Sequence, residues 1–179
     1  MRKWNAVLSL AALVLFLIHG IAGSFLLLGP GSTALKVLAR GMAVLVLIHT
    51  CIGIKYTADS LRVWRRTGAG YFRENQVFWA RRISGLAILV FLLFHMTAFS
   101  AESEGFYRLQ WFNAGKLAVH ILLAASLAVH ILTNIRPLML SLGVKGGRRW
   151  LGDVLFVLAV LLLFMAATFV IYYLRWNLW

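Results

Sequence analysis

Five histidines are the residues of this sequence best suited to chemistry: His19, His49, His95, His120 and His130. A neutral imidazole offers a lone pair from one ring nitrogen to a metal while the other nitrogen donates a hydrogen bond. All five lie within or at the edge of long apolar stretches, where an ionisable side chain is rare and is a functional candidate by default. One histidine alone in such a stretch is more often a structural hydrogen-bonding group. The five therefore have to be weighed as a set.

The elements that carry the histidines are long apolar segments. The chain has 179 residues and 62% of them are hydrophobic, against about half in a typical soluble domain. A membrane-spanning helix needs about 20 mostly apolar residues, and five segments qualify. The expected spans are 6–28, 33–57, 80–101, 114–136 and 152–174. We therefore predict one all-α integral membrane domain over residues 1–179, with five transmembrane helices and a four-helix bundle that carries the histidines.

The hydrophobic run at the start of the chain also invites comparison with a signal peptide. The run is too long for a typical signal core, and no convincing cleavage signature follows it. We therefore expect a retained first helix. The single cysteine, Cys51, excludes an intrachain disulfide and says nothing about the redox compartment.

Positive charge is distributed unevenly between the two ends of these spans. Two basic residues precede the first span, seven lie in the second connection and four in the fourth, against five of the 18 on the other side. Short loops rich in Lys and Arg stay in the cytoplasm, so we expect the N-terminus inside and the C-terminus outside. The net charge of +13 is thus a signal of membrane orientation, and no nucleic-acid partner is expected.

Depth in the membrane sorts four of the histidines into two pairs. A helix rises 1.5 Å per residue, which places His19 and His95 on outward-running helices ~19 and ~18 Å from the inner boundary. His49 and His130 lie on inward-running helices, each six residues before a cation, and so ~9 Å from that boundary. The two pairs are therefore expected ~10 Å apart in depth.

The topology of the bundle selects the same pairs. Short connections make successive helices antiparallel neighbours, so the first helix faces the third and the second faces the fourth across the diagonals. Haem iron takes axial imidazole ligands, and two ligands on opposite faces of a haem must come from opposite sides of the bundle. We therefore predict two bis-histidine haem b groups, an outer one at His19 and His95 and an inner one at His49 and His130.

Two other interpretations of these histidines remain open. Four unrelated structural histidines would need no metal. A zinc ion held by facing helices would normally take more protein ligands than two, and only Cys51, near His49, offers one.

Polar residues near the inner boundary are candidates for contacts with haem propionates or with a quinone head group. The segment from His49 to Lys55 resembles the segment from His130 to Arg136, since each ends in a cation six residues after its histidine. Arginine favours bidentate contacts with carboxylates. Ordinary helix caps and interface anchors are the alternative interpretation. The predicted contact residues are Lys55, Trp79, Arg81, Arg82, Ser84, His120, Asn134 and Arg136.

His120 and the second connection complete the set of candidates. His120 is expected ~21 Å from the inner boundary, at the depth of the outer pair, but the helix diagonally opposite has no histidine there. We expect it to contact a propionate or quinone, or alternatively to face water at the interface. The second connection, Lys55–Arg82, is the largest expected extramembrane piece, broken at Gly68–Gly70, and its basic surface is expected to bind anionic lipid or to dock a partner subunit.

These residues resemble a known family, the membrane anchors of succinate:quinone oxidoreductases, in their single-subunit, five-helix, dihaem cytochrome b form. The string Phe78-Trp79-Ala80-Arg81-Arg82-Ile83-Ser84-Gly85, followed by Phe94-His95, is the most family-like. The resemblance covers nearly the whole chain. Its most specific feature is the order of the histidines, one on each of the first four helices and none on the fifth.

The resemblance implies a role in succinate dehydrogenase or fumarate reductase. The outer pair of histidines would hold the haem distal to the soluble subunits and the inner pair the proximal haem. The partners implied are a flavoprotein with covalent FAD and an iron–sulfur protein on the cytoplasmic side of a bacterial or archaeal cell membrane. Dicarboxylate chemistry would occur in the flavoprotein. This chain would be the membrane subunit of the enzyme, relaying electrons to or from quinone, with menaquinone expected.

The sequence departs from the family at two acidic positions. Some fumarate reductases of this type have a glutamate two residues before the helix-four ligand, where this chain has Ala128, and another at the outer quinol site, which has no counterpart in Gly23–Gly41. His120, Glu102 and Glu104 are the candidates for an outer proton role. The alternative functions are a haem b anchor of a hydrogenase, formate dehydrogenase or nitrate reductase, and a non-redox membrane protein.

Overall fold

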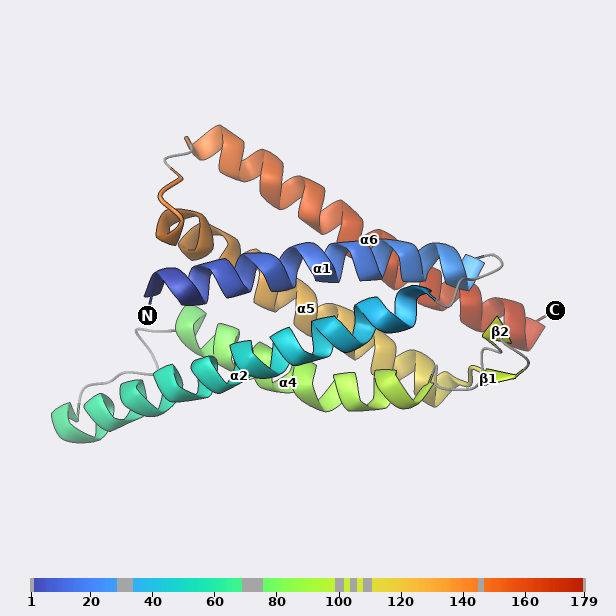
Figure 1. Ribbon diagram of the computed structural model, residues 1–179, viewed down its shortest axis with the longest axis horizontal. Helices are drawn as coiled ribbons and strands as arrows, with labels where there is room; N and C mark the ends of the chain where they lie inside the picture. Colours follow the sequence, from blue (N-terminus) through green and yellow to red (C-terminus); the bar gives the residue numbers. More distant parts are fainter. Residues whose placement is uncertain are drawn as a thin grey trace.

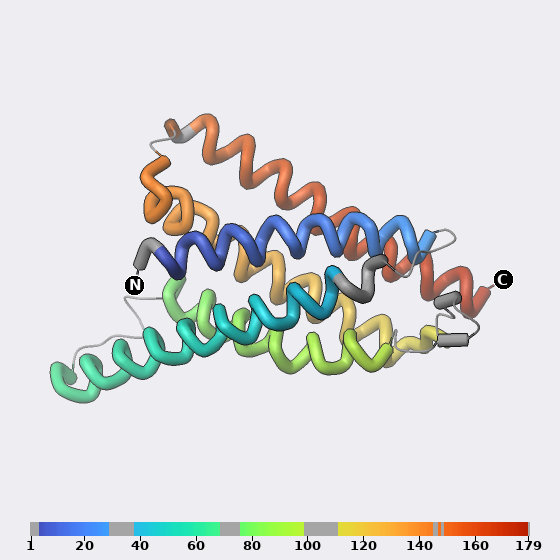
Figure 2. The backbone as a smooth tube through the Cα atoms, in the orientation of Figure 1, coloured from blue at the N-terminus to red at the C-terminus, as the bar shows by residue number. Residues whose placement is uncertain are grey.

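The computed structural model of the chain is a bundle of five long helices (Figures 1 and 2). It describes residues 2–28, 34–68, 76–98, 102–103, 106–107, 111–144 and 147–178. The helices are α1 (Arg2–Leu28), α2 (Ala34–Thr67), α4 (Gln76–Ala98), α5 (Ala114–Ser141) and α6 (Arg148–Leu178). Between α4 and α5, the two-residue strands β1 (Glu102–Ser103) and β2 (Phe106–Tyr107) pair in antiparallel fashion. All five helices are long and apolar enough to cross a membrane, so the predicted all-α, five-span architecture is confirmed.

Several helices are longer than the predicted spans. The second connection, expected as a loop from Lys55, is helical at its start, because α2 continues to Thr67. Hydropathy marks only the part of a helix that lies in lipid, whereas Leu and Arg also favour helix in water. The predicted break at Gly68 is confirmed. Its φ is +60° and its N–H donates to the Trp64 carbonyl, a left-handed cap that glycine adopts without strain.

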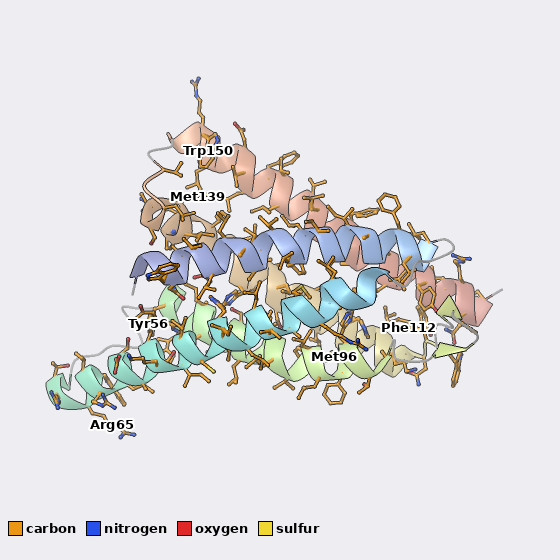
Figure 3. The ribbon with its side chains drawn as sticks, in the orientation of Figure 1. Tyr56, Arg65, Met96, Phe112, Met139 and Trp150 are labelled. Carbon is orange, nitrogen blue, oxygen red and sulfur yellow. The ribbon has the colours of Figure 1, made fainter. Side chains whose placement is uncertain are left out.

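Helices α4 and α5 also extend further than predicted at this end of the bundle. The α4 helix begins at Gln76 rather than near residue 80, and α5 runs through Pro137 to Ser141. In Figure 1 the end of α2 projects beyond the rest of the bundle, and Arg65 lies on this projecting end (Figure 3). The end of the molecule that is expected to face the cytoplasm therefore carries a helical, positively charged arm in place of the expected loop.

The packing order of the helices matches the predicted square. The α1 helix packs along α2, α4 packs along α5, and α1 also touches α5, whereas α2 and α4 meet at only a few positions. In this order α1 lies across from α4 and α2 across from α5. The pairs α1/α2, α4/α5 and α5/α6 are successive in sequence, as expected for helices joined by short connections, whereas α2 and α4 follow one another but scarcely touch.

The fifth span, α6, packs against α1 and α5 at the end of the bundle that is expected to face outside. It crosses α1 at an angle (Figure 1). The buried hydroxyl of Thr168 donates to Ser24 on α1 at 3.3 Å. Arg175 donates to the Leu27 and Leu28 carbonyls, which have no partner within the helix because they belong to its last turn.

Candidate functional site

A cavity of about 800 Å³ runs through the bundle between α1, α2, α4 and α5. Small-molecule sites usually occupy roughly 300–1,000 Å³, so this cavity is large for one. Its wall is mostly apolar, and α6 contributes Leu162, Met165 and Phe169 to it. The histidines that line it are His19, His49, His95 and His130.

The structure brings these four histidines together as the two predicted pairs. The ring centres of His19 and His95 are 6.2 Å apart, with the ring planes at 80°, and those of His49 and His130 are 6.2 Å apart at 88°. A metal–imidazole bond is ~2 Å, and the ring centre lies ~1 Å behind the bonding nitrogen, so two rings on opposite sides of one metal have centres about 6 Å apart. Both pairs therefore fit one iron between two axial imidazoles.

The donor set of each pair is two imidazoles. Among the described residues, no group of three or more His, Cys, Asp or Glu side chains is placed to hold a metal ion. A structural zinc site normally has four protein ligands and a catalytic one three. Haem supplies four equatorial nitrogens of its own and needs only axial ligands from the protein, so the pairs suit haem better than zinc.

The distance between the pairs is larger than predicted. The Nδ1 of His49 lies 3.3 Å from the hydroxyl of Ser9, which is ten residues before His19 on α1. Ten residues of helix rise ~15 Å, so the inner and outer pairs lie ~15 Å apart along the bundle. The predicted ~10 Å was wrong because the two depths were counted from different levels, since α2 and α5 continue past Lys55 and Arg136.

Hydrogen bonds determine which nitrogen of each inner histidine can bind a metal. The Nδ1 of His130 lies 3.1 Å from the Arg81 carbonyl, and because a carbonyl only accepts, Nδ1 carries the proton. The Ser9 hydroxyl donates to the Asn5 carbonyl at 2.7 Å, so it accepts from Nδ1 of His49. Both residues are therefore left with an Nε2 lone pair. Metal-bound histidines almost always donate their second N–H to such an acceptor.

Helix α4 forms the surface against which the His130 ring lies. Besides the Arg81 carbonyl, the Ser84 hydroxyl lies 3.4 Å from its Nδ1. A Cβ placed on Gly85 would come within 3.2 Å of the His130 ring. The absence of a side chain at this position therefore lets the imidazole lie close against the helix.

The predicted contact residues divide into two groups. Trp79, Arg81, Arg82 and Asn134 line the inner half of the cavity. Arg82 donates to the Gly53 carbonyl at 3.2 Å and so connects α4 to α2. Lys55 and Arg136 are exposed and Ser84 is buried beside His130, but none of these three belongs to the cavity wall. Their positions give no support to a direct propionate contact.

His120 is buried beside the outer pair. It is only 1% exposed, so the alternative in which it faces water is wrong. Its ring packs against His95, Phe112 and Phe169, with centres 5.2, 5.1 and 4.7 Å away. His120 does not line the cavity. Phe112 and α6 cover its ring and shield it from solvent. Of the two acids proposed for an outer proton role, Glu102 lies in β1 and Glu104 lies outside the described residues.

Sequence reasoning missed three features of the site: the hydroxyl of Ser9, the role of Gly85 and the cavity wall from α6. Ser9 had a detectable signal. Between Ala6 and Leu28 the polar side chains are Ser9, His19 and Ser24, and a polar group in lipid usually has a partner. The other two features depend on how helices are rotated about their axes.

Comparison with known proteins assigns no family to the chain. A scan against protein-family models, a search of curated proteins and a search of solved structures each find no match. The resemblance to cytochrome b anchors therefore stays a prediction, and a functional assignment has to rest on the two histidine pairs and the cavity between them.

Proposed function

We propose that this chain is a dihaem cytochrome b that transfers electrons between soluble redox subunits and membrane quinone. The observation that supports this most directly is the geometry of the histidines: two imidazole pairs, each with ring centres 6.2 Å apart, on one apolar cavity inside membrane-spanning helices. Haem bound at each pair would supply a one-electron carrier. The two pairs lie ~15 Å apart along helices that cross the membrane, which suits charge transfer between its two sides.

Backbone and side-chain groups around the inner pair would tune such a centre. The Arg81 carbonyl and the Ser9 hydroxyl fix the orientation of the two imidazoles. The apolar wall excludes water, and solvent access and dielectric are among the factors that set a redox potential. Arg81 and Arg82 bring positive charge to the inner half of the cavity, where they would favour the anionic propionates of the cofactor.

Within this class, we propose the membrane anchor of a succinate:quinone oxidoreductase in a bacterial or archaeal cell membrane. The support is the resemblance of the motifs and the distribution of basic residues, which predicts a cytoplasmic N-terminus. The arm of α2 beyond Lys55 exposes Arg62, Arg65 and Arg66 on that side. A flavoprotein and an iron–sulfur subunit would dock at this end, and anionic lipid would contact its rim.

A purified chain tests the proposal through its absorbance. A reduced-minus-oxidised spectrum should contain a b-type signal, and haem extraction should give two haems per chain. A spectrum without that signal would contradict every haem-based function and favour a non-redox membrane protein. Subunits that co-purify from native membranes decide the complex. A dicarboxylate flavoprotein supports the anchor proposed here, whereas a molybdenum or nickel subunit points to a formate dehydrogenase, nitrate reductase or hydrogenase.

The gap between α2 and α4 is the proposed entrance for quinone. Ile54, Ile83 and Leu86 line the cavity and yet are 61%, 65% and 64% exposed. The cavity therefore reaches the lipid-facing surface on this side, where the two helices scarcely touch. A quinone has an apolar tail that stays in lipid, and Trp79 and Arg82 offer hydrogen-bond donors near the entrance.

Blocking this entrance should slow quinone chemistry selectively. The substitution Leu86→Trp adds a large ring at the gap, and we expect quinone reduction by the assembled complex to fall roughly tenfold, equivalent to ~1.4 kcal/mol. Haem content and chemical reduction by dithionite should stay unchanged. The matched control is Leu93→Trp, on the same helix and 68% exposed but outside the cavity wall. Equal effects of the two substitutions would argue against entry between α2 and α4.

Removing the hydroxyl partner of His49 should weaken the inner site. In the variant Ser9→Ala the Nδ1 of His49 loses its acceptor, and loss of such a partner typically lowers metal affinity about 10–100-fold. Haem titration into the haem-free chain measures this. Ser60→Ala is the control, because Ser60 also donates to the carbonyl four residues earlier, at 2.9 Å, but lies outside the cavity wall. Equal affinity in the two variants would mean that Ser9 does not act on His49.

A further inference from the structure

His120 is a polar side chain beside the outer pair and has no role in the proposed function. The inner ligands donate their Nδ1–H to the Arg81 carbonyl and to Ser9. In the outer pair, His95 is in ring contact with His120, with centres 5.2 Å apart and planes at 58°. The Nδ1 of His95 and the Nε2 of His120 are both shielded from solvent.

The tautomer of His120 is fixed from its own helix. Its Nδ1 lies 2.6 Å from the carbonyl of Lys116, four residues earlier on α5. Because this carbonyl can only accept, Nδ1 of His120 carries the proton and Nε2 carries the lone pair. His120 is therefore a hydrogen-bond acceptor at Nε2.

The surroundings of His120 leave little room for water. Phe112 is 0% exposed and lies against one side of the ring, and Phe169 packs against another. Asn177, near the end of α6, donates to the Phe112 carbonyl at 3.0 Å and holds this cover in place. Phe112 lies at the end of the bundle opposite the arm of α2 (Figure 3).

We propose that Nε2 of His120 accepts the Nδ1–H of His95 and so leaves Nε2 of His95 for the metal. A hydrogen bond of ~3 Å between two imidazoles, with each ring centre ~1 Å behind its nitrogen, gives centres about 5 Å apart, so rings whose centres are 5.2 Å apart are close enough to form one. The two nitrogens do not meet hydrogen-bond geometry with each other in the structure, so the proposal requires the rings to rotate into line when the outer site is occupied. The ring contact belongs to the structure, and the hydrogen bond is the proposal. As a positioning role toward haem, it rests on the proposed function.

This hydrogen bond has a defined effect on the outer centre. An acceptor on the second nitrogen makes an imidazole a more basic ligand, which stabilises oxidised iron over reduced iron. The other outer ligand, His19, has an Nδ1 without a hydrogen-bond partner among the described residues. The acceptor that His120 offers to His95 is therefore the contact of this pair that a substitution can remove. Its removal should make the outer centre easier to reduce.

Two substitutions at position 120 separate the hydrogen bond from packing. His120→Phe keeps a planar ring without an acceptor, whereas His120→Gln supplies an amide oxygen. In a redox titration of the full chain, His120→Phe should raise the ratio of reduced to oxidised outer haem about tenfold at a fixed potential, which is ~59 mV for one electron. His120→Gln should shift it clearly less, and the inner haem should not move. The packing control Phe112→Leu, which keeps the acceptor, should also shift it clearly less.

The outcomes separate this inference from the proposed function. A wild-type chain without haem overturns both. A wild-type chain with two haems whose outer potential is the same in His120→Phe overturns only the hydrogen bond, as does an equal shift in His120→Gln. If His120→Phe loses the outer haem, nitrogen NMR of the haem-free wild-type chain decides. Protons on Nδ1 of both His95 and His120 support the proposal, and a proton on Nε2 of His120 overturns it.

Discussion

Replacing both histidines of one pair is expected to remove one haem, whereas replacing one from each pair is expected to remove both. In the structure His19 faces His95, and His130 faces His49. We therefore expect the variant His19→Ala/His95→Ala to keep one haem per chain and the variant His19→Ala/His130→Ala to keep none. A haem with a single axial ligand from the protein is held weakly, so the first substitution in a pair already causes the loss. Haem extraction against protein concentration measures the ratio.

The same experiment tests the pairing itself. Substitutions within one site are strongly non-additive, whereas those in separate sites add. The second alanine within a pair should therefore cost no further haem. If the chain with His19→Ala and His130→Ala kept one haem while the chain with His19→Ala and His95→Ala kept none, the partners would be exchanged and the bundle order wrong. Two haems in either double variant would mean that these histidines are not the ligands.

The pairing was predictable because it depends on quantities that a sequence contains. Helical rise converts residue number to depth, and short connections determine which helices are neighbours. His19 and His95 could therefore be matched by counting alone. The distance between the pairs was less accessible. It depends on where each helix meets the bilayer, and α2 continues as a helix well past Lys55, so charge is a poor marker of that level.

The partners of His120 and the importance of Ser9 could not be read from the sequence for a different reason. Which face of a helix points inward is normally inferred from a polar face and an apolar face. Membrane helices are apolar on all sides, so this signal is lost. The contact of His120 with Phe112 and Phe169 is set by how α5 and α6 are rotated. Ser9 also bonds the carbonyl four residues earlier, a common pattern for serine in helices, and so resembles an ordinary structural residue.

A side chain at position 85 is expected to remove the inner haem without disturbing the outer one. A Cβ on Gly85 would lie 3.2 Å from Cε1 and 3.3 Å from Nδ1 of His130, which is tighter than ordinary contact. In Gly85→Val the two methyl groups extend further into the ring, so His130 has to move away from the Arg81 carbonyl. The helix itself is not weakened, because glycine is the poorer helix former by up to ~1 kcal/mol. The haem-to-protein ratio should fall from two to one, and Gly85→Ala should retain the inner haem at reduced affinity.

The control for this substitution is Gly41→Val on α2, where an added Cβ would meet nothing within 4 Å. It carries the same change of side chain in another membrane helix, and it should keep both haems. The haem lost in Gly85→Val should be the one that is also lost in His130→Ala, which a redox titration identifies by its missing component. Two haems with unchanged potentials in Gly85→Val would show that the His130 ring does not need the space beside α4. Loss of both haems would show that the packing of α4, rather than only the position of the His130 ring, depends on this glycine.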